Sequence, residues 1–141
     1  MSNSILVPHD GSADGQGALE YALETFPDAR LVLFYAIDPF EVTPDEDRLP
    51  ALSDAWLEDQ REEAAALFDD ALEEAETGAV TIETETRVGS PPEAIVAAAE
   101  DLAVDQVVLG SRGRGQITDA RMGSTAELVV KRADVPVTVV R

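Results

Sequence analysis

The chain contains no cysteine, which excludes disulfide bonds, thiolate metal sites and cysteine nucleophiles. No run of apolar residues is long enough to span a bilayer. The segment from Met1 to Ser4 has no basic residue and no small-residue cleavage site, so we expect a cytoplasmic rather than a secreted protein. A length of 141 residues with 45% hydrophobic content predicts a single domain with its own core.

Positive charge is also scarce, because 10 Lys and Arg stand against 29 Asp and Glu, for a formal net charge of -19. Such a surface repels the phosphate backbone, which disfavours general nucleic-acid binding. It suits a cytosol of very high salt, where screening shortens the range of self-repulsion. We interpret it as the signature of a halophilic archaeon or a similar organism, with an acidic mesophilic protein as the alternative.

The few bases are concentrated near the C-terminus. Residues 110–141 hold six bases and three acids, a local charge of +3, whereas the remaining 109 residues hold four bases and 26 acids, or -22. This contrast favours an anionic ligand near residues 110–141. The alternative is chance clustering, combined with a helix end at which Lys131 and Arg132 complement the dipole.

Strand-like and helix-like patterns alternate along the whole chain. Apolar runs predict buried strands at residues 5–7, 31–37, 106–109 and 135–140, and a period of two predicts an edge strand at 80–86. Apolar residues at helical spacing predict helices at 18–26, 53–77, 90–102 and 124–132. The last two helices begin with the spacing of a capping box, Ser90 with Glu93 and Ser124 with Glu127. The order predicts an α/β fold, a doubly wound parallel sheet with helices on both faces, Rossmann-like.

Sheets of this kind bind ligands beyond the carboxyl ends of their strands, where the winding reverses. The turn-rich segments 8–12 and 110–124 each follow a predicted strand and are therefore the candidate walls of a site. Glycines in the second segment would let backbone N–H groups approach a phosphate, and the helix start adds further donors. Spacing alone leaves a phosphate loop and a plain turn capped by Ser124 equally open. The Gly-x-x-x-x-Gly-Lys-Ser/Thr motif is absent, and Thr118 stands where a dinucleotide fingerprint has its third glycine.

His9 is the only histidine and lies within four residues of Asp10 and Ser12. Three such neighbours at one strand end rarely reach the mutual geometry of a catalytic triad. We therefore interpret His9 as lining a pocket and Asp10 as a hydrogen-bond acceptor for ligand or loop. A metal site made of these two side chains alone is too sparse, so no catalytic and no metal-ligating residue is predicted.

Gly110 and Gly113, followed after nine residues by Gly123 and Ser124, resemble the ATP-binding loop of the universal stress protein family. The resemblance extends to the opening strand and Asp-Gly-Ser turn at 5–12, the Gly-Ser-Pro at 89–91 and the closing strand at 135–140. It identifies residues 1–141 as a universal stress protein domain. It also implies a five-stranded sheet in the order 3-2-1-4-5.

The resemblance further implies which residues hold ATP. Base and ribose would contact the ends of the first two strands, and the phosphates would contact the glycine loop with Mg²⁺ or Mn²⁺ brought in by the nucleotide. The implied nucleotide-binding residues are Pro8, His9, Asp10, Ala36, Gly110, Arg112, Gly113, Gly123, Ser124 and Thr125. His9 departs from the small or aliphatic residue that is common in the family, and residues 116–121 are more polar than usual.

The expected function is therefore an ATP-binding sensor or regulator of the stress response. No activated nucleophile is recognisable, so at most slow hydrolysis of ATP is expected. The alternative is an interaction protein of the same fold that binds no nucleotide. A third hypothesis, an enzyme of a related nucleotide α-hydrolysing or adenylyl-transferring α/β group, ranks last. Such enzymes have a His-x-Gly-His or Ser-Gly-Gly-x-Asp-Ser signature near the first strand, and residues 9–12 match neither. The resemblance also implies a homodimer through the C-terminal strand, whose apolar edge would otherwise invite aggregation.

Overall fold

The computed structural model describes residues 3–39, 53–113 and 122–141. Within these ranges strands and helices alternate strictly, as the sequence predicts. The elements are β1 Ser4–Pro8, α1 Ala13–Thr25, β2 Arg30–Ile37, α2 Asp54–Glu74, β3 Thr81–Val88, α3 Pro91–Asp101, β4 Gln106–Gly110, α4 Ser124–Arg132 and β5 Val137–Val140.

The strands form one parallel sheet in the order β3-β2-β1-β4-β5, which confirms the expected topology. From β1 the chain winds outward to β2 and β3, and then returns to place β4 on the other side of β1. The winding therefore reverses between β1 and β4, where Ile5 pairs with Gln106 and Leu6 with Val107. The carboxyl ends of these two strands are the place where such folds accept ligands.

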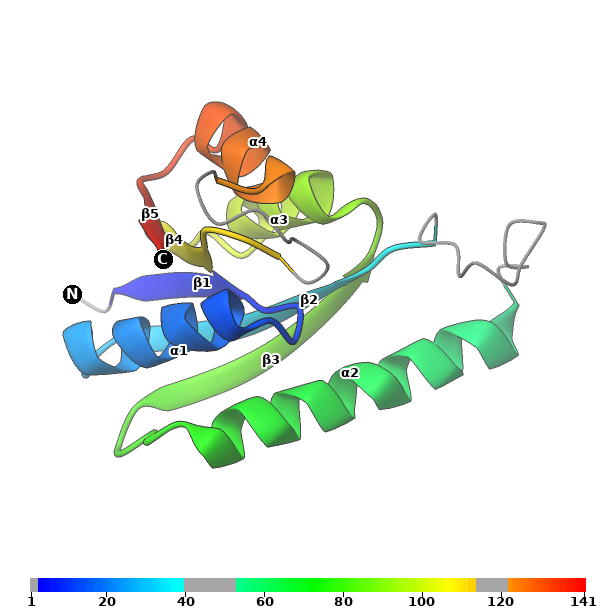
Figure 1. Cartoon of the computed structure of the whole chain (residues 1–141), viewed down its shortest axis with the longest axis horizontal. Coiled ribbons are helices and arrows are strands. Elements are labelled where there is room, and N and C mark those ends of the chain that lie inside the picture. The colour runs from blue at the N-terminus through cyan, green and yellow to red at the C-terminus, as the bar shows by residue number, and fades with distance from the viewer. Residues whose placement is uncertain (1–2, 40–52, 114–121) are drawn as a thin grey trace.

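Helices cover both faces of the sheet, with α1 and α2 on one side and α3 and α4 on the other (Figure 1). Side chains of β1 alternate between the two layers: Ile5 and Val7 pack with α1 and α2, whereas Leu6 packs with α3 and α4. Because both faces are covered, β1 needs a continuous apolar run, and these three side chains are fully buried. No helix in the described part of the chain has both the length and the apolar character that a membrane span needs.

The edge position predicted for β3 is confirmed. The capping boxes predicted for α3 and α4 are wrong, because no side chain caps either helix. Ser90 does stand at the N-cap of α3, with Pro91 and Pro92 in the first turn as expected, but its side chain accepts no hydrogen bond from the helix. In α4 the N-cap is Gly123, one residue earlier than expected, so Ser124 already belongs to the helix.

Candidate functional site

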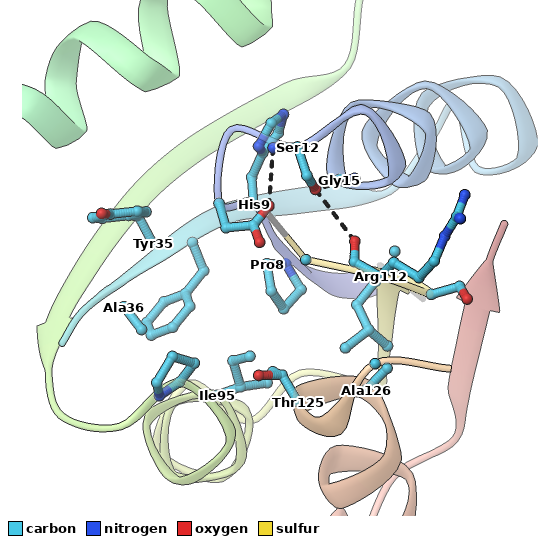
Figure 2. A pocket seen from close by; sticks show the side chains of 18 of the residues that line it. Pro8, His9, Ser12, Gly15, Tyr35, Ala36, Ile95, Arg112, Thr125 and Ala126 are labelled. Atoms are coloured by element: carbon cyan, nitrogen blue, oxygen red, sulfur yellow. Dashed lines mark hydrogen bonds between the residues drawn. The ribbon is translucent and has the colours of Figure 1, made fainter. Parts of the chain in front are cut away.

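A cavity of about 330 Å³ lies at the carboxyl ends of β1, β2 and β4, bordered by the first turns of α1, α3 and α4 (Figure 2). This volume lies at the lower end of the range of small-molecule sites. The structure brings together here all the residues for which nucleotide binding was predicted, and that binding stays a prediction. They are Pro8, His9, Asp10, Ala36, Gly110, Arg112, Gly113, Gly123, Ser124 and Thr125.

Among the described residues, half of the lining was not predicted to bind the nucleotide, although two of these residues, Ser12 and Ser111, lie in the segments 8–12 and 110–124 that were expected to form walls. Apolar periodicity assigns Ile95 and Ala126 to a core, and both do pack in one, yet the same residues also border the cavity. Periodicity cannot separate these two roles. The Gly-Ser-Pro motif at 89–91 was noted only as part of the family resemblance, and its Pro91 also lines the cavity. The further lining residues are Ser12, Gly15, Phe34, Tyr35, Asp38, Pro91, Ile95, Leu109, Ser111 and Ala126.

The start of α4 forms the polar end of the cavity. Gly123, Ser124 and Thr125 line it, and no side chain caps the helix. The backbone oxygen of Gly123 accepts from the N–H of Glu127 at 3.0 Å, which leaves the amides of the first turn before Glu127 without an acceptor in the helix. These amides and the positive end of the helix dipole make this end of the cavity suitable for an anion.

Gly123 is needed where it stands. Its N–H donates to the Ser111 carbonyl at 2.6 Å, and an added Cβ would lie 3.2 Å from that same oxygen. A Cβ here would fit only if the neighbouring backbone moved by a few tenths of an ångström. The glycine thus lets the helix start approach the strand end closely, which places the free amides beside the cavity.

Arg112 and Asp14 join the end of β4 to the first turn of α1. Both the backbone N and Nε of Arg112 donate to Oδ2 of Asp14, at 3.0 and 3.2 Å. Part of the guanidinium charge that the sequence offered to phosphates is therefore offset by a carboxylate. Gly110 serves the same junction, since an added Cβ would lie 2.5 Å from the backbone carbon of Asp14.

The turn between β1 and α1 forms the third wall. Asp10 acts as the predicted hydrogen-bond acceptor of the loop, because its Oδ1 receives the Ser12 N–H at 3.0 Å. The Ser12 Oγ accepts from Gly15 N at 3.1 Å and donates to the Arg112 carbonyl at 3.4 Å. Gly11, between Asp10 and Ser12, has a φ of +88°, a conformation that glycine adopts without strain.

The ring of His9 lies beside the start of α1 and is 6% exposed (Figure 2). Its Nδ1 accepts from the Gly11 amide and its Nε2 meets Oε1 of Gln16, both at 2.9 Å. Since an amide can only donate, Nδ1 holds a lone pair and Nε2 holds the proton. Both nitrogens are engaged, so neither is placed to activate Ser12. Within the residues that the structure covers, no group of three or more His, Asp or Glu could hold a metal ion.

The fold and the site together define the class of this protein. It is a doubly wound α/β protein with a parallel sheet and a cavity at the point where the winding reverses. Residues 1–141 match the model of the Universal stress protein family. The chain belongs to this family.

The chain is similar to Universal stress protein MJ0577 of Methanocaldococcus jannaschii, with 31% identity over all of this chain and 96% of that protein. The solved MJ0577 structure has 30% identity, covers 99% of this chain and 96% of its own, and gives a TM-score of 0.81. A universal stress protein in complex with cAMP has 24% identity, coverage of 99% and 97% and a TM-score of 0.72. A universal stress protein family protein from Arabidopsis thaliana with AMP bound has 18% identity, covers 98% of this chain and 90% of its own, and gives a TM-score of 0.69. At these last two identities the likeness supports the fold.

Proposed function

We propose that this universal stress protein binds an adenine nucleotide, ATP, in the cavity at the switch point and acts as a sensor or regulator of the stress response. The observation that carries the proposal is the start of α4, which has no side-chain cap and borders the cavity. Apolar residues line another part of the same cavity. One end offers free amides to phosphate, and the other offers apolar contact to a base. Other solved members of this fold hold cAMP and AMP, which share the adenine base.

The two ends of the cavity assign the parts of the ligand. Adenine lies between Ala36 on β2 and the side of the cavity that Pro91 and Ile95 of α3 line. Figure 2 shows Ala36 and Ile95 away from Arg112. Asp10 accepts hydrogen bonds from ribose. The phosphates lie against the amides of Gly123 to Thr125 together with Gly110 and Gly113, and Mg²⁺ or Mn²⁺ arrives with them and neutralises part of their charge.

Fast hydrolysis is not part of the proposal. The histidine and the serine of the site are engaged with the protein: Nδ1 and Nε2 of His9 meet Gly11 and Gln16, and the Ser12 hydroxyl meets Gly15 and Arg112. Of the carboxylates at the cavity, Asp10 accepts from the Ser12 amide through Oδ1. A general base must have a free acceptor within reach of the proton that it removes. We therefore propose a nucleotide that is held, with little or no turnover.

Titration calorimetry in multimolar KCl with Mg²⁺ tests the binding. ATP, ADP and AMP should bind, and GTP serves as the matched ligand of equal charge. Protein purified from its cells should release an adenine nucleotide on denaturation. If folded protein binds none of the adenine nucleotides and releases none, the proposal is wrong. Incubation with ATP and measurement of phosphate release then separates a binding protein from an ATPase.

A specific observation favours the second candidate, an interaction protein with an empty pocket. Arg112 is paired with Asp14, and the carboxylates of Asp10 and Asp38 also border the cavity, so negative charge opposes a polyphosphate. The double variant Gly113→Ala and Gly123→Val separates the two functions. If it stays folded and supports stress survival in cells as well as the wild type, the pocket is dispensable and the second candidate holds.

The homodimer, the cytoplasmic location and the halophilic origin belong to the same proposal. β5 is the last strand of the sheet order, and its residues Val137–Val140 are all partly exposed. A second copy could pair with this edge and cover it. Light scattering at high salt measures the mass, and a monomer would remove the dimer from the proposal.

Unfolding at decreasing KCl tests the halophilic origin. If the protein is halophilic, its stability should fall as the screening of its negative charges is lost.

A further inference from the structure

A chain of hydrogen bonds runs from the wall of the cavity to the last turn of α2. The Gly11 amide donates to Nδ1 of His9, and Nε2 of His9 donates to Oε1 of Gln16 on α1. The side-chain amide of Gln16 then donates to the Ala71 carbonyl on α2 at 3.0 Å. His9 thus connects β1, α1 and α2, and it borders both the cavity and a second hollow between the two helices.

The first bond of this chain requires a neutral ring. Nδ1 can accept from Gly11 only while it holds a lone pair, and protonation would turn two N–H groups toward each other. The amide concerned lies in the middle of the turn that places Asp10 and Ser12 on the cavity wall. Gly11 has a φ of +88°, and glycine has the widest choice of other conformations. Loss of the bond would therefore release the turn.

Charged groups from each neighbouring element line the two hollows that His9 borders. On the turn and the cavity side they are Asp10, Asp38 and Arg112, and around the second hollow they are Glu20 from α1 and Glu63, Asp70 and Glu74 from α2. All but Arg112 are carboxylates. Because most of these groups are negative, they would not repel a positively charged ring. The effect of protonation therefore falls on the hydrogen bond to Gly11.

Resting on the nucleotide site proposed above, we propose that His9 is a positioning residue of that site: its neutral Nδ1 orders the turn from Asp10 to Ser12, and its protonation weakens nucleotide binding. His9 acts through the turn and does not touch the nucleotide with its ring. Acidification that protonates the ring would then release the ligand.

His9→Asn is the variant that tests this inference. Its Oδ1 can occupy the place of Nδ1 and accept from Gly11, and it cannot titrate. His9→Ala has no acceptor. The dissociation constant for ATP is measured at pH 8 and pH 5.5 in constant KCl and Mg²⁺, and each wild-type value is divided by the His9→Asn value at the same pH. The ratio cancels the protonation of ATP itself.

At pH 8, His9→Asn should restore most of the binding that His9→Ala loses. The ratio should rise severalfold by pH 5.5, because protonation removes the lone pair that accepts from Gly11 and affinity falls with the competent fraction. If the wild type binds ATP at pH 8 but the ratio of the two dissociation constants is the same at pH 8 and pH 5.5, this inference alone is overturned. No binding at pH 8 overturns the proposed function and this inference with it.

Nuclear magnetic resonance of the wild-type protein gives a second test that does not depend on folding of the variants. The imidazole ¹⁵N shifts should report a proton on Nε2 at pH 8, and the amide signals of Asp10, Gly11 and Ser12 should move together with the ring as the pH falls. A proton on Nδ1 at pH 8, or turn amides that do not follow the ring, would overturn the inference.

Discussion

Two helices, α1 and α4, begin at the wall of the same cavity and finish their first turns in opposite ways. In α1 the Ser12 hydroxyl accepts from Gly15, and the carboxylate of Asp14 adds a negative charge to the first turn. In α4 the N-cap is Gly123 and no side chain caps the helix. The positive end of α1 is thus satisfied by the protein itself, whereas that of α4 has no side-chain cap and is where we propose that the phosphates lie.

The glycines beside the two helices differ in the same way. Gly110 brings the end of β4 against the backbone of Asp14 in α1, and this junction is closed by protein atoms. Gly123 brings α4 to the Ser111 carbonyl and leaves free amides beside the cavity. Gly110 therefore serves packing, whereas Gly123 stands where binding is proposed, so the two interpretations left open by the spacing of the loop can apply to different residues.

The largest effect is expected at the closed junction. Gly110→Ala places a Cβ 2.5 Å from a backbone carbon of Asp14, and overpacking should lower the free energy of unfolding by about 3 kcal/mol. Denaturant unfolding at constant KCl measures this value. Gly17→Ala in α1 is the control, because its Cβ would meet only Val140 Cγ1, at 3.9 Å, and should stabilise the helix by up to about 1 kcal/mol. Equal stability of the two variants would show that Gly110 is not needed for packing.

The open helix start should respond in binding rather than in stability. Gly123→Asp supplies a side-chain cap and a negative charge where the phosphates are proposed to lie, and it should weaken ATP binding by about 2 kcal/mol, roughly thirtyfold. Gly123→Ala is the matched control, since it adds the same Cβ without the carboxylate. Calorimetry measures both variants. If they bind ATP equally well, the start of α4 is not the phosphate site and the contrast with α1 disappears.

Much of the fold follows from local patterns. Apolar runs such as residues 31–37 and helical spacing in 53–77 identify the elements, because buried parallel strands need apolar side chains on both faces. The sheet order came from the family resemblance. Residues at the ends of β1 and β4 could be assigned to one site because the carboxyl ends of adjacent parallel strands meet at one edge of the sheet.

The contacts that tune the site could not be predicted. Asp14 and Arg112 are 98 positions apart, and no spacing rule joins them. Gln16 reaches both His9 and Ala71 only because α1 and α2 pack side by side. The cap of α4 falls one residue before the predicted Ser124, and helix ends are the least certain part of any pattern. Part of residues 110–124, with Arg114 and Arg121, lies outside the described residues.

A smaller effect is expected at the start of α1. Ser12→Ala removes its cap and should lower the free energy of unfolding by about 1 kcal/mol, while ATP affinity changes by no more than about threefold. Ser53→Ala is the matched control, because Ser53 caps α2 in the same way through a bond to the Trp56 amide at 3.1 Å and does not line the cavity. Thermal unfolding and calorimetry of both variants test the expectation. A loss of ATP affinity specific to Ser12→Ala would make α1 a second anion-binding helix.

The smallest effect is expected for the ion pair that joins the two regions. Asp14→Asn and Arg112→Gln together keep the local net charge, and the pair, whose arginine side chain is 35% exposed, should contribute at most about 1 kcal/mol to stability. If Arg112 acts only through Asp14, the double variant should bind AMP, ADP and ATP with the same relative affinities as the wild type. A direct contact between Arg112 and the phosphates would instead produce a loss that grows from AMP to ATP. Calorimetry with the three nucleotides decides whether the charge of Arg112 belongs to the closed junction at α1 or to the open site at α4.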